Sequence, residues 1–234
     1  MKICLFGIAG VSLGKHNVKD PRLDEADRLV EAKKKVYVQV DVADDKEIAT
    51  ADVIAASPDS RLDLILQDLD FVETRLDRNP AEPERAALFK LKARLEAEGF
   101  VSEAVLTPEE TQALAVHTCF LTSKPVVVAT ADELAKPELL ILRAYAASGH
   151  ISFLTVGGKE NRAWTIRAGT TAWDAAGAIH SDIQKGFIRA EIISYADLVE
   201  HGGETGAKRA GKQRLEGKTC VMQDYDVVNF RFNK

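Results

Sequence analysis

The chain has 234 residues, of which 46% are hydrophobic and 29% are charged, and its formal net charge is −5. These values are ordinary for a soluble globular protein of one or two domains, and no apolar run approaches the roughly 20 residues that a membrane-spanning helix needs. Residues 1–7 are too short and too soon interrupted by glycine for a signal peptide. The three cysteines, Cys4, Cys119 and Cys220, lie far apart, which predicts reduced core cysteines in the cytoplasm.

The N-terminal stretch combines a buried strand with an incomplete phosphate-binding pattern. Residues 2–8 form an apolar run that predicts the first strand of an α/β domain. In the following Ala9-Gly-Val-Ser-Leu-Gly-Lys-His16, Gly14 and Lys15 fit the pattern [AG]-x4-G-K-[ST], but His16 replaces the hydroxyl that binds Mg²⁺. Pro21 follows too early to leave room for the helix whose free amides hold the phosphates. The stretch therefore predicts that a working P-loop is absent.

The middle of the chain predicts strands and an amphipathic helical pair. Residues 22–32 favour a short helix and residues 34–43 a strand, while residues 125–130 and 151–156 favour strands on either side of a helix at 137–148. Ser57 and Asn79 are expected to begin two helices, and Thr107 to cap a third. The first helix carries an apolar stripe that predicts the core of a hairpin rather than a groove for a partner: Leu62, Ile65, Leu69, Val72 and Leu76.

The C-terminal part predicts a compact module of strands around one helix. Residues 160–167 and 186–194 alternate as strands do, and in the segment 172–180 Trp173, Ala176 and Ile179 fall on one helical face. Residues 219–232 favour two short strands around an Asp-rich turn. Strand, helix, strand and terminal hairpin is the order of a small β-grasp fold.

The same residues carry a family resemblance. The segments 162–166, 176–191 and 223–233 closely resemble the C-terminal TGS domain of the YchF/Obg-like ATPases, which are P-loop NTPases of the translation-factor class. One departure is Tyr225, where the family usually has glycine between two aspartates. If that turn requires a positive φ, tyrosine costs more than glycine.

The resemblance extends to remnants of the nucleotide site. Residues 20–23, Asp-Pro-Arg-Leu, resemble the family's switch segment, and the helix that normally precedes it is missing. The resemblance implies that Asp44 is the aspartate of the Mg²⁺ motif, although Glu47 replaces its glycine and would repel a phosphate. It also implies that Glu133 belongs to the base-reading motif, in which Thr130 replaces asparagine. The segment with the family's catalytic histidine is absent.

The candidate site residues follow from these remnants. A residual nucleotide site would use Gly14, Lys15, Asp44 and Glu133, with no catalytic residue. Candidates for RNA or ribosome contacts form a basic cluster: Lys208, Arg209, Lys212, Arg214 and Lys218. The alternative interpretation of that cluster is a solvated helix face. No metal site is predicted, because the five histidines show no ligand spacing with one another or with the cysteines.

We therefore expect two domains. The first is an α/β reduced P-loop-NTPase-like domain, residues 1–60 and 119–157, with an inserted helical hairpin at 61–118. The second is an α+β β-grasp (ubiquitin-like) TGS domain at 158–234. The first domain's sheet would contain residues 2–8, 34–43, 125–130 and 151–156. Because the missing elements would leave open sheet edges and apolar surface, we also expect a homo-oligomer.

Three functions are compatible with this organisation. The leading hypothesis is a cytoplasmic, non-catalytic binding module for the ribosome, RNA or a translation factor, with no cofactor and no membrane partner. The alternative is an ATP- or GTP-binding protein, or a weak NTPase, that binds nucleotide with Mg²⁺ through Lys15, Asp44 and Glu133. A small-ligand sensor is a third possibility, for which no residue identifies the ligand.

Overall fold

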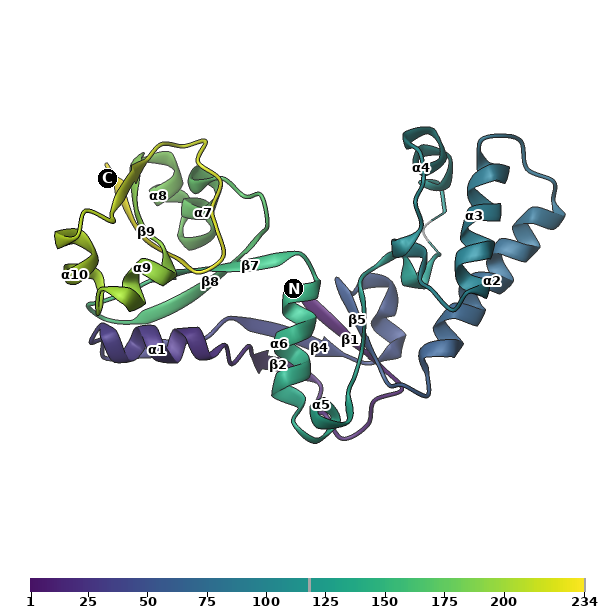
Figure 1. Cartoon of the computed structure of the whole chain (residues 1–234), viewed down its shortest axis with the longest axis horizontal. Helices are drawn as coiled ribbons and strands as arrows, with labels where there is room; N and C mark the ends of the chain where they lie inside the picture. Colours follow the sequence, from purple (N-terminus) through teal and green to yellow (C-terminus); the bar gives the residue numbers. More distant parts are fainter. Residues whose placement is uncertain (118, 234) are drawn as a thin grey trace. The chain divides into compact units, whose positions relative to one another are not determined.

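The computed structural model describes residues 1–117 and 119–233 (Figure 1). The described chain contains two sheets, one of five and one of six strands, and it divides into two compact units. The first unit consists of Met1–His16 and Val40–Ser148. The second consists of Asn17–Gln39 and the chain from Gly149 onward. This mixed α/β architecture agrees with the expected fold class at that level.

The sheet of the first unit has the strand order β2-β4-β1-β5-β6. Strand β1 is parallel to β4 and to β5, and β5 is parallel to β6. Helix α6 (Pro137–Ala147) packs against β1, β5 and β6, and short helices follow β4 and β6: η1 (Asp45–Thr50) and α5 (Ala131–Ala135). The strands are β1 (Lys2–Phe6), β2 (Gly14–Asn17), β4 (Gln39–Ala43), β5 (Val53–Ala56) and β6 (Val126–Val128).

A helical pair extends from this sheet between β5 and β6. Helices α2 (Arg61–Asp77) and α3 (Glu84–Glu96) pack together, followed by η2 (Val101–Glu103), α4 (Pro108–Leu114) and η3 (Leu121–Ser123). Their buried core comprises Ile65, Val72, Ala87, Leu88, Leu91, Leu95, Phe100, Leu114 and Phe120. Helix α4 has the expected cap at Thr107, whose side chain accepts from the Glu110 amide.

Two details of the helical pair differ from the sequence prediction. Helix α2 begins at Arg61 and not at Ser57, because the Ser57 hydroxyl closes a turn by accepting from the Ser60 amide. Leu62 is 46% exposed, while Asp68 is buried among the apolar residues. Its carboxylate accepts from the amides of Leu121 and Thr122, each at 2.8 Å, which compensates for its removal from water. Helix α3 likewise begins at Glu84, after a turn that follows Asn79.

The sheet of the second unit has the order β10-β9-β11-β7-β8-β3. Strands β7 and β8 are antiparallel, and β11 is parallel to β7 and antiparallel to β9. The strands are β3 (Lys35–Val36), β7 (His150–Thr155), β8 (Asn161–Arg167), β9 (Phe187–Ile193), β10 (Arg214–Glu216) and β11 (Asp226–Phe232). The helices are α1 (Pro21–Leu29), α7 (Ala172–Ile179), α8 (Ser181–Lys185), α9 (Tyr195–Glu200) and α10 (Glu204–Arg209).

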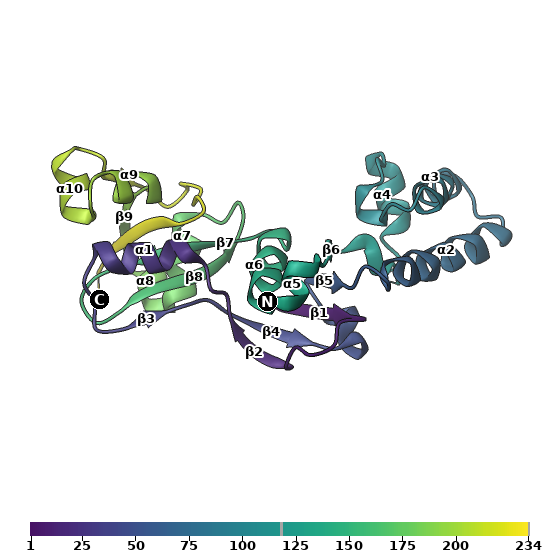
Figure 2. The same ribbon diagram turned by 60° about the horizontal axis from the view of Figure 1, so that its bottom comes forward.

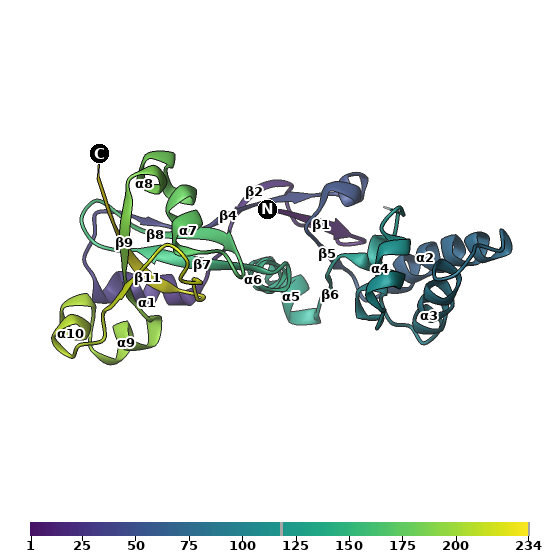
Figure 3. The ribbon, with the colours of Figure 1, turned by 90° about the horizontal axis from the view of Figure 1, so that it is seen from above.

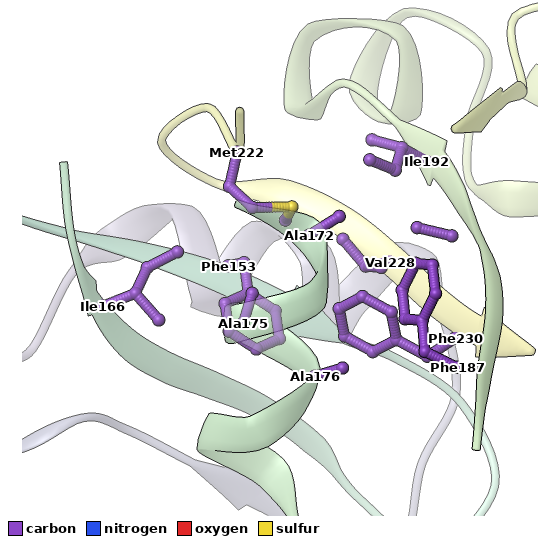
Figure 4. Close-up of a cluster of buried hydrophobic side chains, with 11 residues drawn as sticks. Phe153, Ile166, Ala172, Ala175, Ala176, Phe187, Ile192, Met222, Val228 and Phe230 are labelled. Carbon is purple, nitrogen blue, oxygen red and sulfur yellow. The ribbon is translucent and has the colours of Figure 1, made fainter. Parts of the chain in front are cut away.

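Figure 4 shows the core between this sheet and α7. Ala172, Ala175 and Ala176 are fully buried, and these small side chains let the helix lie close to the aromatic residues of the sheet. Phe153, Phe187 and Phe230 fill the space beneath them. Trp173, expected on the buried face, is 38% exposed, because the alanines and not the tryptophan face the sheet.

Three strand predictions were wrong. Residues 34–43 do not form one strand: they divide into β3, which joins the second sheet, and β4, which joins the first. Residues 151–156 do not belong to the first sheet, because β7 pairs with β8 along its whole length. Residues 219–232 do not form a terminal hairpin, since β11 pairs with β9 and β7 instead.

Residues 17–39 are an integral part of the second unit. Helix α1 packs against β8 and α9 and buries Leu23 and Ala26 completely, and β3 extends the sheet beside β8 (Figures 2 and 3). The fully buried Asn161 joins these parts: its amide nitrogen donates to Asp27 Oδ1 at 2.8 Å and to the Val30 carbonyl at 2.7 Å. Its side-chain oxygen accepts from the Gly157 amide at 2.7 Å. The compact units are thus divided differently from the predicted domains, whose boundaries stay a prediction.

A second contact fixes the start of α1. Asp20 caps the helix, and the Arg22 guanidinium lies between the carboxylates of Asp20 and Asp224, 2.7 Å from each. The same guanidinium lies 3.7 Å from the ring centre of Tyr225. Tyr225 has φ +63°, so the turn does require the left-handed region, at a cost of about 1 kcal/mol for a residue other than glycine. Burial of the ring and its contact with Arg22 offset that cost.

We predict that Asn161→Ala destabilises the second unit by about 2–4 kcal/mol, because it removes the side-chain partner of the Val30 carbonyl and of the Gly157 amide and one partner of Asp27. Both tryptophans, Trp164 and Trp173, lie in this unit, so fluorescence during urea unfolding measures its free energy of unfolding.

The matched control is Asn229→Ala, since Asn229 is exposed and makes only a 3.4 Å contact with Glu191. A loss of stability no larger than in this control would contradict the role of Asn161.

Candidate functional site

The segment after β1 contains the first three residues of interest, Gly14, Lys15 and His16. It leaves the sheet at Gly7, where a Cβ would lie 1.9 Å from the Ser60 hydroxyl, so only glycine fits there without movement. The segment then forms strand β2, on which Lys15 is exposed. His16 Nε2 lies 2.6 Å from the Ser12 carbonyl oxygen, which closes the segment on itself.

No helix begins between the end of β1 and Asp20 in this described part of the chain. The first helix is α1, and Asp20 already accepts a hydrogen bond from its Arg22 amide at 2.9 Å. A P-loop holds phosphate with free amides at the start of the helix that follows it. In this chain the residues that would begin such a helix, Gly14–Asn17, form strand β2 instead.

Asp44 lies directly after β4 and caps the short helix η1. Its carboxylate accepts from the Lys46 amide at 3.1 Å, and the nearby Glu47 forms an ion pair with Lys2. The neighbouring Cys4 is buried, and burial raises the pKa of its thiol to about 11, so this thiol is neutral at physiological pH. Cys220 is half-buried and Cys119 is exposed, so the prediction of a core cysteine is wrong for Cys119.

Glu133 forms its hydrogen bonds and its ion pair with residues of its own unit. It closes a capping box with Thr130 at the start of α5, and Arg143 of α6 donates to both of its carboxylate oxygens, at 2.6 and 2.7 Å. The Arg143 guanidinium is the main reason that the pKa of Glu133 lies below its usual range. The residue is only 8% exposed. A purine edge would have to compete with Arg143 for this carboxylate.

The sheet order determines which of these residues share a side of the sheet. Asp44 and Thr130 follow β4 and β6, which run parallel to β1, so they share the edge at the carboxyl ends of the strands. Strands β1 and β5 separate β4 from β6, a spacing of about 14 Å. Lys15 lies instead on β2, at the end of the sheet beside β4.

The basic cluster lies in and after α10, and acidic residues neutralise much of it. Lys208 pairs with Glu204 at 3.2 Å, Lys212 with Asp197 at 3.1 Å, and Arg214 contacts Asp226 and Glu216, each at 3.5 Å. Within the described ranges, Arg209 and Lys218 are the members of the cluster without an ion pair, and both are exposed. These two cations are the ones available to a phosphate backbone.

One group of possible metal ligands was not predicted from the sequence. Asp197, Glu200 and His201 each bring a ligand atom within 4.8 Å of the others, as their spacing on and beside α9 allows. Lys212 already neutralises Asp197, which also accepts from the Ser194 hydroxyl at 2.6 Å. We therefore assign no metal to this group.

Comparisons with known proteins relate this chain to one family. The family model YchF-GTPase_C, described as a protein of unknown function (DUF933), matches residues 150–233. The ribosome-binding ATPase YchF of Bacillus subtilis is 34% identical over 237 residues, which cover 74% of this chain and 64% of that protein. The YchF of Haemophilus influenzae is 54% identical over 94 residues, 40% of this chain and 26% of that protein.

The fold comparison covers more of the chain. The structure of the Schizosaccharomyces pombe YchF GTPase aligns with 99% of this chain and 97% of its own, with a TM-score of 0.73 and 20% identity, which shows a shared fold. In the described residues no helix has the length and apolar character needed to cross a bilayer.

The chain spans less than two thirds of the length of the curated relatives described above, 64% and 26%. Residues 150–233 therefore carry a YchF-GTPase_C domain, and the chain is similar to longer proteins named ribosome-binding ATPase YchF.

Proposed function

We propose that this chain is a ribosome-binding module that works without a nucleotide switch. In this proposal a reduced P-loop-NTPase-like domain and its inserted helical hairpin accompany a β-grasp TGS domain, in the cytoplasm. The names of the relatives support the partner, since they are ribosome-binding ATPases. The YchF-GTPase_C family model matches residues 150–233.

The observation that most directly supports a module without a nucleotide switch is strand β2. A triphosphate needs an anion-binding turn that runs into a helix, and the residues after Gly14 and Lys15 form an extended strand instead. The Asp-Pro-Arg-Leu segment that would respond to nucleotide is packed into the second unit through Asp20 and Arg22. We therefore expect no bound ATP or GTP and no hydrolysis.

The second candidate function is nucleotide binding with Mg²⁺. The position of Asp44 at the carboxyl edge of the parallel strands favours it, because this edge is where α/β sheets bind ligands. In this alternative, Glu133 would release Arg143 to contact a base, and Lys15 would turn toward a phosphate. Nucleotide titration separates the two candidates.

We predict that isothermal titration of the full chain with ATP or GTP, with Mg²⁺, gives no binding tighter than about 100 μM. Removal of Mg²⁺ should change nothing, and Lys15→Ala should behave as the wild type does, because Lys15 is an exposed strand residue. Tighter binding that disappears in Lys15→Ala would establish the nucleotide-binding candidate instead.

We predict that the chain sediments with purified ribosomes and that the double variant Arg209→Glu, Lys218→Glu binds about tenfold more weakly. Each reversal places an acid where a cation would meet a phosphate, so the salt dependence of binding should also become shallower. The control is Arg78→Glu, an exposed arginine at the end of α2.

Equal binding by the double variant and the wild type would remove the basic cluster from the interface. Failure of the wild type itself to sediment with ribosomes would refute the proposed function.

The predicted homo-oligomer stays part of this proposal. In the described part of the first sheet, β2 and β6 are the terminal strands, and each offers an edge to which another copy could pair.

A further inference from the structure

Strand β11 is longer than its neighbour on one side. It pairs with β9 from Val227 to Phe232, and Asn233 continues the contact by donating to the Gly186 carbonyl at 2.9 Å. On the other side, β7 pairs with Asp226 and Val227 only, because β7 ends at Thr155. Among the described residues, no strand neighbours the segment 229–232 on this side.

On this side the backbone groups of the segment have no partner strand among the described residues. Alternate residues of a strand direct their N–H and C=O groups to opposite sides, so some of these groups between Asn229 and Phe232 point away from β9. Four residues of strand are about 13 Å long, enough for a short extended peptide. A peptide backbone is the chemical group whose donors and acceptors match such an edge.

Two cavities adjoin the C-terminal half of β11, one beside the unpaired segment and one at the end of the strand, where Gly186 and Asn233 also line it. One, of about 380 Å³, is lined in part by Thr155, Ile179 and Phe230. The other, of about 780 Å³, is lined in part by His180 and Lys185. Ile183 and Phe232 line both cavities, so the two cavities are adjacent, and we call them together the β11 groove.

The apolar residues that line the β11 groove lie at the edge of the hydrophobic core. Phe230 belongs to the buried cluster of Figure 4, and Ile179 and Ile183 pack against that cluster. Phe232 is 37% exposed at the point where the cavities meet. An extended segment with apolar side chains at alternate positions would bury this surface as it paired with the strand.

The charges of the groove favour polypeptide over RNA. Glu204 pairs with Lys208 at 3.2 Å, and Asp182 lies 3.5 Å from His180. Lys185 is exposed and has no ion pair within the described ranges. A nearly neutral apolar groove gives little attraction for a phosphate backbone, whereas one lysine at its end suits a single acidic side chain.

We propose that the β11 groove binds an extended polypeptide segment of a ribosomal protein, apolar at alternate positions and with an acidic residue near Lys185. The segment adds a strand to β11. This inference rests on the proposed ribosome-binding function, and it names a protein component of the ribosome as the ligand of this surface.

The test is co-sedimentation of the full chain with purified ribosomes, together with hydrogen exchange of the amides of residues 228–233. The variants are Phe232→Asp and the milder Phe232→Ala, and tryptophan fluorescence checks their folding. The matched control is Ile188→Asp, because Ile188 is 54% exposed on β9 and outside both cavities.

We expect Phe232→Asp to weaken binding at least tenfold and Phe232→Ala about threefold, consistent with the loss of a buried aromatic contact, while Ile188→Asp stays within about twofold. We also expect ribosomes to slow exchange in residues 228–233. This part of the affinity should change little between about 50 and 200 mM salt, unlike a phosphate contact.

The outcomes separate the two proposals. If the wild type does not bind ribosomes, both fail. If it binds and the Phe232 variants match Ile188→Asp, only the groove proposal fails. Loss of binding in Phe232→Asp without slower exchange, and with steep salt dependence, would assign the surface to RNA and overturn the polypeptide assignment.

Discussion

The attachment of residues 17–39 to the C-terminal sheet is the constraint on which the rest of the structure depends. Asn161 makes three hydrogen bonds of 2.7–2.8 Å that join β8, the end of α1 and the turn after β7. Arg22, between two carboxylates and over the Tyr225 ring, fixes the start of the same helix. Because the fully buried Asn161 is costly to separate from its hydrogen-bond partners, the segment belongs to the second unit.

This constraint limits the length of chain available for a phosphate-binding turn. The chain has only the residues between Phe6 and Pro21 to leave β1 and reach α1. A loop at 7–13, strand β2 and the connection at 18–20 occupy them. A P-loop helix would need about ten further residues to form three turns. The contact of Tyr225 with Arg22 fits the same account, since the tyrosine ring lies against the guanidinium near the start of α1.

Sequence patterns predicted two of the C-terminal strands and one of the three expected helix caps. Alternation and Gly186 defined β8 and β9, and Thr107 with Glu110 defined α4. Strand β5 was missed because all four of its residues are buried and show no alternation. The division of residues 34–43 between two sheets could not be predicted, since each half pairs with a strand distant in sequence.

For the candidate site, too, local sequence patterns predicted local features but not contacts between distant residues. Pro21 and His16 were sufficient to question the P-loop, because both act locally. The engagement of Glu133 by Arg143 depends on the placement of α6 beside α5, and no local pattern indicates it. The neutralisation of Lys208 and Lys212 depends on Glu204, one turn away, and on Asp197 of α9. Cations counted in sequence therefore overstated the charge available to a partner.

Hydrogen exchange of α1 in the full chain, with and without millimolar Mg·ATP, tests the central claim most directly. If residues 17–39 are a fixed part of the second unit, the amides of α1 exchange as slowly as those of β8, and Mg·ATP leaves them unchanged. Rapid exchange of α1 beside a protected β8, or a change in α1 when Mg·ATP is added, would contradict the account.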